Sequence, residues 1–169
     1  MAIGRCFEES FQKAMRSLET GFSGWGGDRE EPELTDAELD RQLRTPSPER
    51  ILSVRTAMVR GRSDEEIHRI SRIDPWFLAK LRRIIEAEAR LIKGKSLDQL
   101  DADSLFEAKQ LGFSDRQIAW HTNSDELSVR QRRHQLEVRA VFKTVDTCAA
   151  EFASSTPVSY THLTLPTIP

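Results

Sequence analysis

Doublets of carboxylates are the groups of this sequence that come closest to a catalytic pattern. Glu8-Glu9, Asp64-Glu65-Glu66 and Asp125-Glu126 each place neighbouring acids in one short segment, as general acid–base chemistry requires. Each doublet also falls in the first turn of an expected helix. A carboxylate there stabilises the helix dipole by a few tenths to about 1 kcal/mol. We therefore interpret these acids as helix-capping residues.

The histidines and cysteines form no metal-ligand pattern. They are His68, His121, His134, His162, Cys6 and Cys148. Because their spacing matches no zinc motif, we expect surface or half-buried histidines. Cys148 has only Lys143 as a nearby basic group, too little to activate a nucleophile. Two lone thiols far apart in sequence are typical of a reduced, cytosolic protein. The sequence therefore predicts no catalytic, cofactor-binding or metal-binding residue.

A glycine-rich segment and an aromatic pair are the remaining candidates for ligand binding. The segment 21–27 has the glycines of a phosphate-binding loop, but it follows a helix rather than a strand, and no Lys-Ser or Lys-Thr completes the motif. We expect it to be a flexible helix exit. Trp76 and Phe77 have rings that stack on a base or ligand, but inside an amphipathic helix we expect core side chains.

Helix start and stop signals organise most of the chain. Thr35–Glu38 and Ser63–Glu66 have the capping-box pattern. Asp74-Pro75 opens the longest expected helix, which runs to about Lys93. Five further helices are expected. They run from Phe7 to before Gly21, from Ser47 to before Gly61, from Asp101 to Leu111, from Ser114 to Thr122 and from Ser124 to near Leu136. The pattern predicts an all-α, multihelical fold with two small helical lobes and an extended C-terminal segment.

The longest helix is expected to anchor the core, because burying each apolar side chain on its face contributes roughly 1.5–3 kcal/mol. That face consists of Phe77, Leu78, Leu81, Ile84, Ile85, Leu91 and Ile92. The charged residues Glu86, Glu88 and Arg90 are expected to face solvent.

Composition supports this fold class and limits the partners. Of 169 residues, 38% are hydrophobic and 31% charged, with a formal net charge of −2. These values favour amphipathic helices with wide solvated faces and give no general attraction to nucleic acid or anionic lipid. No stretch approaches the roughly 20 apolar residues that span a bilayer. We expect a cytoplasmic protein without a membrane partner.

A helix-turn-helix is the alternative interpretation of one segment. Ser114–Leu127 has the required rhythm, and a basic helix with Arg130, Arg132 and Arg133 follows. However, Asp125 and Glu126 occupy the positions that would face DNA. From residue 114 to 139 five Arg stand against four acids, a net of +1, and specific binders usually neutralise more phosphates. We expect no nucleic-acid partner, but a nucleic-acid-binding module remains the alternative function.

The run Val145–Phe152 matches neither helical nor strand periodicity, yet it resembles a segment of a known family. It is similar to the segment that leads into the second half of the carbamoyl-phosphate synthase large chain. Other stretches resemble the connecting, or oligomerisation, domain of that chain in the same order. They are Met1–Arg5, Phe7–Ala14, Arg16–Glu19, Arg44–Pro46, Glu49-Arg50, Ile73–Leu78, Gly112–Asp115 and Gln117–Ala119. The resemblance covers about residues 1–157.

The resemblance implies part of a ligase that joins glutamine-derived ammonia, bicarbonate and two ATP into carbamoyl phosphate for arginine and pyrimidine synthesis. The full enzyme would need ATP, Mg²⁺ or Mn²⁺, and K⁺, and its partners would be a glutaminase small chain and flanking ATP-grasp halves. This piece would be structural, without cofactor and inactive alone, and would support a homo-oligomer.

The resemblance also implies an organisation of the chain, which we expect to be a fragment. We expect residues 1–20 to form a helix leaving the first ATP-grasp half, 21–34 a glycine-rich linker, 35–94 and 95–137 two helical lobes, 138–157 an extended linker, and 158–169 a non-native or disordered tail. The departures are Cys6, Ala140 and Phe142, where the family usually has Thr, Pro and Tyr, together with the uncharged tail.

Overall fold

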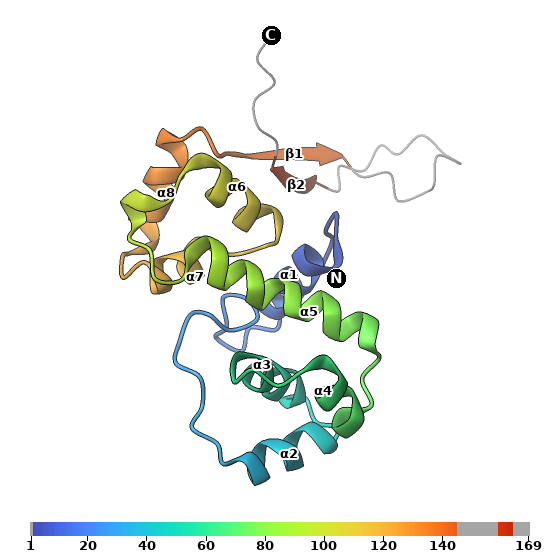
Figure 1. The fold of residues 1–169 in the computed structure, drawn as a ribbon. Helices are drawn as coiled ribbons and strands as arrows, with labels where there is room; N and C mark the ends of the chain where they lie inside the picture. Colours follow the sequence, from blue (N-terminus) through green and yellow to red (C-terminus); the bar gives the residue numbers. More distant parts are fainter. Residues whose placement is uncertain (1, 145–158, 164–169) are drawn as a thin grey trace, which may run out of the picture.

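A computed structural model gives the fold of residues 2–144 and 159–163. Within these residues helices dominate, and the all-α class predicted from the sequence is confirmed (Figure 1). The α-helices are α1 (Phe7–Ser17), α2 (Asp36–Arg44), α3 (Arg50–Val59), α4 (Asp64–Ser71), α5 (Pro75–Ala87), α6 (Ala102–Gln110), α7 (Asp115–His121) and α8 (Glu126–Gln135). A π-helical turn η1 (Glu88–Ile92) extends α5, and a 3₁₀ turn η2 (Leu97–Gln99) precedes α6.

The expected capping residues begin most of the helices. Thr35 and Ser63 each accept a hydrogen bond from the backbone N–H three residues on and complete a capping box, which satisfies donors that the first turn leaves unpaired. Asp74 accepts a hydrogen bond from the Trp76 N–H at 2.8 Å and places Pro75 at the first helical position. These local signals set where α2, α4 and α5 start.

Two helices begin later than the sequence predicts. Residue 47 was expected to cap α3, but the helix starts at Arg50, and its N-cap Glu49 makes no side-chain cap bond. The cap of α8 is Asp125, whose Oδ1 accepts from the Ser128 N–H at 2.9 Å. Ser124, the expected start, instead has its hydroxyl 2.8 Å from the Thr122 hydroxyl. Competing local hydrogen bonds of this kind shift helix starts by a residue or two.

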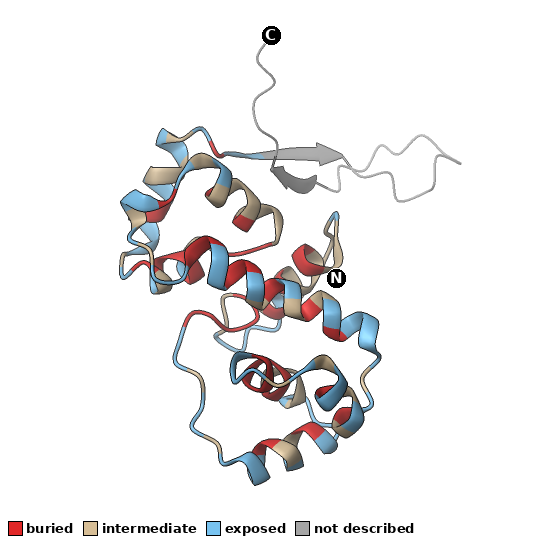
Figure 2. Cartoon of the chain, in the orientation of Figure 1, coloured by how far each residue is buried: buried red, intermediate tan, exposed pale blue. Residues whose placement is uncertain are grey.

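The helix α5 runs between two groups of helices. The group α2, α3 and α4 lies at one end of the molecule, and α6, α7 and α8 lie at the other (Figure 1). Leu78, Leu81 and Ile84 of α5 are buried, as predicted, and a red stripe of buried residues follows the helix in Figure 2. The buried apolar residues of both groups belong to one continuous core cluster, so α5 anchors the core.

The glycine-rich segment 21–27 is part of the core rather than a flexible helix exit, so that expectation was wrong. Its central residue Trp25 is fully buried, and the indole N–H donates to the Ile51 carbonyl at 2.9 Å. The Gln12 side chain accepts from the Trp25 N–H at 3.0 Å, and Gln117 donates to the Gly26 carbonyl at 2.7 Å. The segment therefore joins α1, α3 and α7 through satisfied buried polar groups.

Two short strands lie beyond the helices. β1 (Ala140–Thr144) pairs antiparallel with β2 (Ser159–Leu163), with Ala140 opposite Leu163 and Thr144 opposite Ser159. β1 lies in the segment expected to be extended. β2 lies in the segment for which the sequence predicts a disordered or non-native tail, and this strand was not predicted. Val145–Phe152 lies outside the described residues. No helix of the described residues is long and apolar enough to cross a membrane.

Candidate interaction surface

The histidines and cysteines do not come together in the described residues, where no group of three or more His, Cys, Asp or Glu side chains is placed to hold a metal ion. His68 Nδ1 lies 2.7 Å from the Ile73 carbonyl oxygen, and His134 is exposed. Burial raises the pKa of the half-buried Cys6 thiol, which disfavours the reactive thiolate. Cys148 lies outside the described residues.

The first acidic doublet joins two helices in addition to occupying the first turn of α1. Glu8 and Glu9 are both buried. Glu8 Oε1 lies 2.9 Å from the Arg83 guanidinium of α5, and Glu9 Oε1 accepts from Lys13 at 2.8 Å. The capping pattern did not predict the ion pair between Glu8 and Arg83, because the spacing within α1 does not show which helix packs against it.

A buried cluster of charge lies where α3, η1 and α7 meet the segment after the glycines. We call it the Arg55 cluster; its members are Arg55, Glu88, Glu31 and His121. Arg55 Nη2 donates to both oxygens of Glu88 at 2.9 Å, and Arg55 Nε donates to Glu31 Oε1 at 2.6 Å. His121 Nε2 lies 3.3 Å from Glu88 Oε1. The bonds of Arg55 to Glu88 and Glu31 are charge-assisted hydrogen bonds of the strong class.

Glu88 was expected to face solvent, and that prediction was wrong. Its side chain is only 7% exposed, and that of Arg55 is 4% exposed. Glu88 follows Ile84 by four residues and precedes Leu91 by three, so helical spacing places it on the apolar face. The carboxylate is tolerated there because a guanidinium meets it. A buried charge without a partner would be strongly destabilising.

The ionised state of Glu88 is favoured by its partners. Burial opposes ionisation, but the contact with His121 and the charge of Arg55 outweigh it and lower the pKa of Glu88. Glu88 therefore contributes stability that is present above the ordinary carboxylate pKa and is lost as pH falls below it.

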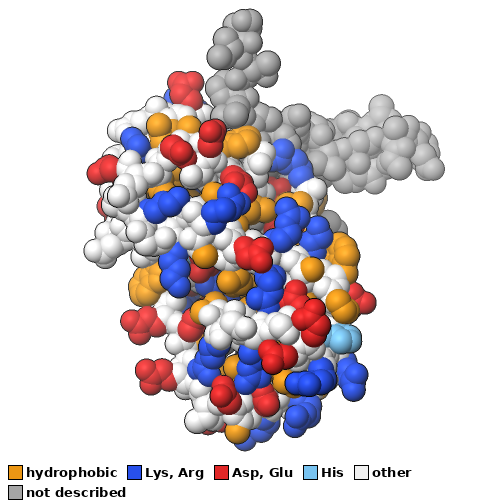
Figure 3. All heavy atoms as spheres, in the orientation of Figure 1, with side chains coloured by type: hydrophobic (Ala, Val, Ile, Leu, Met, Phe, Trp, Pro, Cys, Tyr) orange, Lys and Arg blue, Asp and Glu red, His pale blue; other side chains and the backbone are white. Residues whose placement is uncertain are grey.

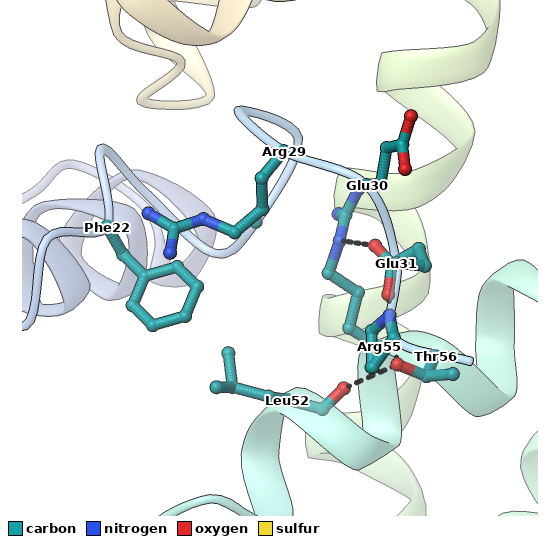
Figure 4. A pocket seen from close by; sticks show the side chains of 9 residues that line it. Phe22, Arg29, Glu30, Glu31, Leu52, Arg55 and Thr56 are labelled. Atoms are coloured by element: carbon teal, nitrogen blue, oxygen red, sulfur yellow. Dashed lines mark hydrogen bonds and ion pairs between the residues drawn. The ribbon is translucent and has the colours of Figure 1, made fainter. Parts of the chain in front are cut away.

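A pocket of about 280 Å³ lies on the solvent side of this cluster. Arg55, Glu31 and Thr56 lie along one side, and Phe22 with Arg29 stacked on its ring at 4.0 Å forms the other (Figure 4). Glu31 is held by Arg55 and by the Thr56 hydroxyl, which donates to Glu31 Oε2 at 2.9 Å. Its carboxylate is thus committed to structural contacts rather than free for acid–base chemistry.

The glycines of the 21–27 segment are needed for this packing. Gly26 and Gly27 both have φ of +69°, a conformation that side chains other than glycine rarely adopt. A Cβ on Gly27 would lie 2.7 Å from Glu88 Oε2 and 3.1 Å from His121 Nε2. The segment therefore packs at close range against the Glu88 carboxylate.

Two neighbouring aromatic side chains are exposed at the start of α5. Trp76 is 54% exposed and Phe77 is 46% exposed, so the prediction that they are core side chains was wrong. They lie in the first turn of α5, next to the exposed Asp74-Pro75 cap and at the pale blue end of that helix in Figure 2. Aromatic side chains are enriched at protein interfaces relative to the rest of the surface, so an exposed Trp next to an exposed Phe indicates an interaction site.

Contacts with α1 fix the orientation of these rings. The Phe7 ring lies 5.6 Å from that of Trp76 and 5.7 Å from that of Phe77, and the last two lie edge to face at 5.0 Å. Lys80 Nζ lies 5.5 Å from the Trp76 ring. We call Phe7, Trp76, Phe77 and Lys80 the aromatic surface. Ring contacts continue inward from Phe7 to Phe11 and Trp25, so the surface rests on the core.

In the segment with the helix-turn-helix rhythm, basic side chains form hydrogen bonds within the protein. Arg133 donates to both oxygens of Asp115, at 2.9 and 2.6 Å, and Lys109 donates to Asp115 at 2.9 Å. We call these three residues the Asp115 cluster. Arg132 donates to the Leu100 carbonyl at 3.3 Å. Two of the three arginines that would contact phosphates are therefore committed to the fold.

Burial and neighbouring charges shift the pKa values of the Asp115 cluster in opposite directions. Burial lowers the pKa of Lys109 to about 8, despite the neighbouring Asp115 carboxylate. Burial also opposes ionisation of Asp115, but Arg133 and Lys109 outweigh it and lower the pKa of that carboxyl.

Comparison with known proteins identifies the family. Residues 1–137 match the family described as carbamoyl-phosphate synthetase large chain, oligomerisation domain. Over 160 residues, 95% of this chain, the chain is 51% identical to the carbamoyl phosphate synthase large chain of Nostoc sp. and 52% identical to that of Synechocystis sp.. It is 49% identical over 161 residues, 95% of the chain, to the arginine-specific, chloroplastic large chain of Oryza sativa.

The matched region is a small part of those proteins. The chain spans 14% of the length of the Nostoc and rice relatives and 15% of the Synechocystis relative. The family match includes α1 to α8, with both clusters and the aromatic surface. This chain belongs to the family of the oligomerisation domain of the carbamoyl-phosphate synthetase large chain.

Proposed function

We propose that this domain joins large chains of carbamoyl phosphate synthase into a homo-oligomer through its aromatic surface. The observation that carries the proposal is the exposure of Trp76 and Phe77, at 54% and 46%, in a helix whose following turns are buried. Protein interfaces are enriched in aromatic side chains. A second copy is the occupant we favour, because oligomerisation is the described role of the matched family.

The geometry supports a preformed contact rather than one that must be ordered on binding. Phe7 orients both rings, so little side-chain entropy remains to be lost on association. Asp74, the N-cap of α5, carries a carboxylate next to the rings, and Lys80 carries an ammonium 5.5 Å from the Trp76 ring. Two copies related by a two-fold axis can place the Asp74 of each opposite the Lys80 of the other, as an isologous interface requires.

We also propose that the domain acts within a larger enzyme. As in the relatives' name, that enzyme would make carbamoyl phosphate, using ammonia from glutamine, bicarbonate and two ATP, with Mg²⁺ or Mn²⁺ and K⁺. The glutaminase small chain and the flanking ATP-grasp halves would be its partners. This domain would be non-catalytic, a proposal supported by the carboxylates of Glu8, Glu88 and Asp115, which are each held in ion pairs. ATP turnover by the purified chain would contradict it.

Sedimentation velocity across a range of protein concentrations tests the surface. The wild-type chain should shift from monomer to a larger species as concentration rises. The double variant Trp76→Ser with Phe77→Ser should raise the dissociation constant at least about thirtyfold, since buried aromatic anchors contribute about 2 kcal/mol or more. The variant should keep the helical circular dichroism of the wild type.

The control is Trp120→Ser. Trp120 is 49% exposed but lies on α7, outside the aromatic surface, and its removal should leave the dissociation constant unchanged. Equal association of the double variant and the wild type would refute this surface. A wild-type chain that stays monomeric at every concentration would refute the second copy as the occupant.

A further inference from the structure

A groove lined by arginines lies at the end of the molecule opposite β1. It has a volume of about 830 Å³ and is bounded by the C-terminal end of α2, the start of α3 and the C-terminal end of α4. The guanidinium-bearing residues of its lining are Arg44, Arg50, Arg69 and Arg72. Figure 3 shows Lys and Arg side chains at this end of the molecule, with Asp and Glu side chains between them.

The positive charge of the groove is not neutralised by the protein. Asp40 is the carboxylate of the lining, and it is already bonded to Arg62. Arg50 reaches only the Ser71 carbonyl, at 3.4 Å. Within residues 2–144 and 159–163, no ion pair involves any of the four groove arginines. Like charges in a concave surface repel one another and concentrate counter-ions, so the groove is an attractive site for a multiply charged anion.

The backbone conformation of Arg72 offers a way to test this residue. This residue ends α4 with φ of 59° and ψ of 18°, in the left-handed region. The helices that end near Gly61 and Gly112 use glycine for that conformation, because glycine has no Cβ to clash with the backbone there. Glu19, Asn123 and Glu137 also have positive φ, so the conformation itself does not mark a site, but Arg72 adds a fourth cation to the groove.

We propose that this groove binds a small ligand that carries a pyrophosphate-type group. Guanidinium forks match the oxygens of a phosphate in pairs, and four of them suit two linked phosphates better than one carboxylate. The volume is in the range of small-molecule sites. This proposal does not depend on the aromatic surface, which lies on α1 and the start of α5.

Isothermal titration of the wild-type chain with inorganic pyrophosphate and, separately, with ADP tests the proposal. Both should bind saturably at one site at low ionic strength, and more weakly as salt is added. The double variant Arg44→Gln with Arg69→Gln should lose at least about tenfold in affinity for both. Arg90→Gln, which removes an exposed arginine paired with Glu107, is the control and should bind as the wild type does.

The comparison of the two probes separates the sources of the phosphate group. Tighter binding of ADP than of pyrophosphate would identify a nucleotide, and equal binding would identify the pyrophosphate group alone. Absence of binding, equal affinity in the double variant, or binding of an acidic peptide without binding of either probe would overturn the proposal.

The variant Arg72→Gly distinguishes a ligand-binding role of Arg72 from a purely structural one. Glycine relieves the left-handed backbone, so the melting temperature should rise while the affinity for pyrophosphate falls. Glu137→Gly is the matched control, because Glu137 also has a positive φ, 60°, after a helix. It should raise the melting temperature and leave the affinity unchanged. Unaltered affinity in Arg72→Gly, at full helical content, would remove Arg72 from the site.

Discussion

The Arg55 cluster and the Asp115 cluster are both groups of charge with little exposure to solvent, but they join very different parts of the chain. Arg55 bonds Glu31 across a sequence separation of 24 and Glu88 across a separation of 33. Asp115 bonds Lys109 across a separation of 6 and Arg133 across a separation of 18. The first cluster ties α3 and η1 to the glycine-rich region, whereas the second stays within α6 to α8.

This difference has an energetic consequence. Among the described residues, the Arg55 guanidinium is the one cation that meets both Glu31 and Glu88. Asp115 has two cations, so either can partly replace the other. We therefore expect the Arg55 cluster to be sensitive to single substitutions and the Asp115 cluster to tolerate them.

The largest effect should follow from Arg55→Ala. Removing the guanidinium leaves the buried Glu88 carboxylate without its main partner, and breaking a buried pair in this way costs about 3–5 kcal/mol. Urea denaturation followed by circular dichroism measures the change in unfolding free energy. Arg90→Ala, which breaks an exposed pair with Glu107, should cost no more than about 1 kcal/mol. Equal costs for the two variants would show that burial of the cluster adds nothing.

A smaller but still large effect is expected from Gly27→Ala. The new Cβ would meet Glu88 Oε2 at 2.7 Å in a backbone with φ of +69°, and we expect a loss of about 2–4 kcal/mol from strain and displaced contacts. Gly61→Ala is the matched control, since Gly61 has φ of +83° and no atom within 4 Å of its Cβ. It should cost about 1 kcal/mol. The same denaturation experiment compares them, and equal losses would mean that contact with the Arg55 cluster is unimportant.

The smallest effect is a change in stability at alkaline pH, which we expect from the Asp115 cluster. Because burial lowers the pKa of Lys109 to about 8, the unfolded chain binds more protons than the folded one between that pH and the ordinary lysine pKa. Stability from this residue should therefore rise with pH across that window, by roughly 1–2 kcal/mol. The measurement is the unfolding free energy of the wild type minus that of Lys109→Met, from pH 7.5 to 10. A flat difference would contradict the lowered pKa.

The same comparison explains how much of the molecule was predictable. Capping residues such as Thr35, Ser63 and Asp74 act within one turn, so their helices and the all-α class could be predicted from the sequence. The Arg55 cluster could not, because its members meet only after the chain has folded back on itself. The interpretation of the glycine-rich segment as a flexible exit failed for the same reason.

A signal for the buried pair was nevertheless present in the sequence. Arg55 lies between Val54 and Met58 on the buried face of α3, and Glu88 lies between Ile84 and Leu91 on the buried face of α5 and η1. Opposite charges at apolar positions of two helices predict a buried ion pair when they are considered together. The aromatic surface offered no such signal. Trp76 and Phe77 lie in the first turn of α5, where Phe7 of α1 packs against both rings but leaves about half of each side chain exposed.

The tryptophans occupy environments that make them natural optical probes of separate events. Trp25 is fully buried beside Phe11, whereas Trp76 is 54% exposed and Trp120 is 49% exposed. A buried indole emits at shorter wavelength than a hydrated one, so Trp25 alone should shift markedly to the red when the chain unfolds. Trp76 should shift to the blue when its ring is covered by a partner. Variants that keep a single indole would let the emission spectrum report folding through Trp25 and assembly through Trp76, without an added dye.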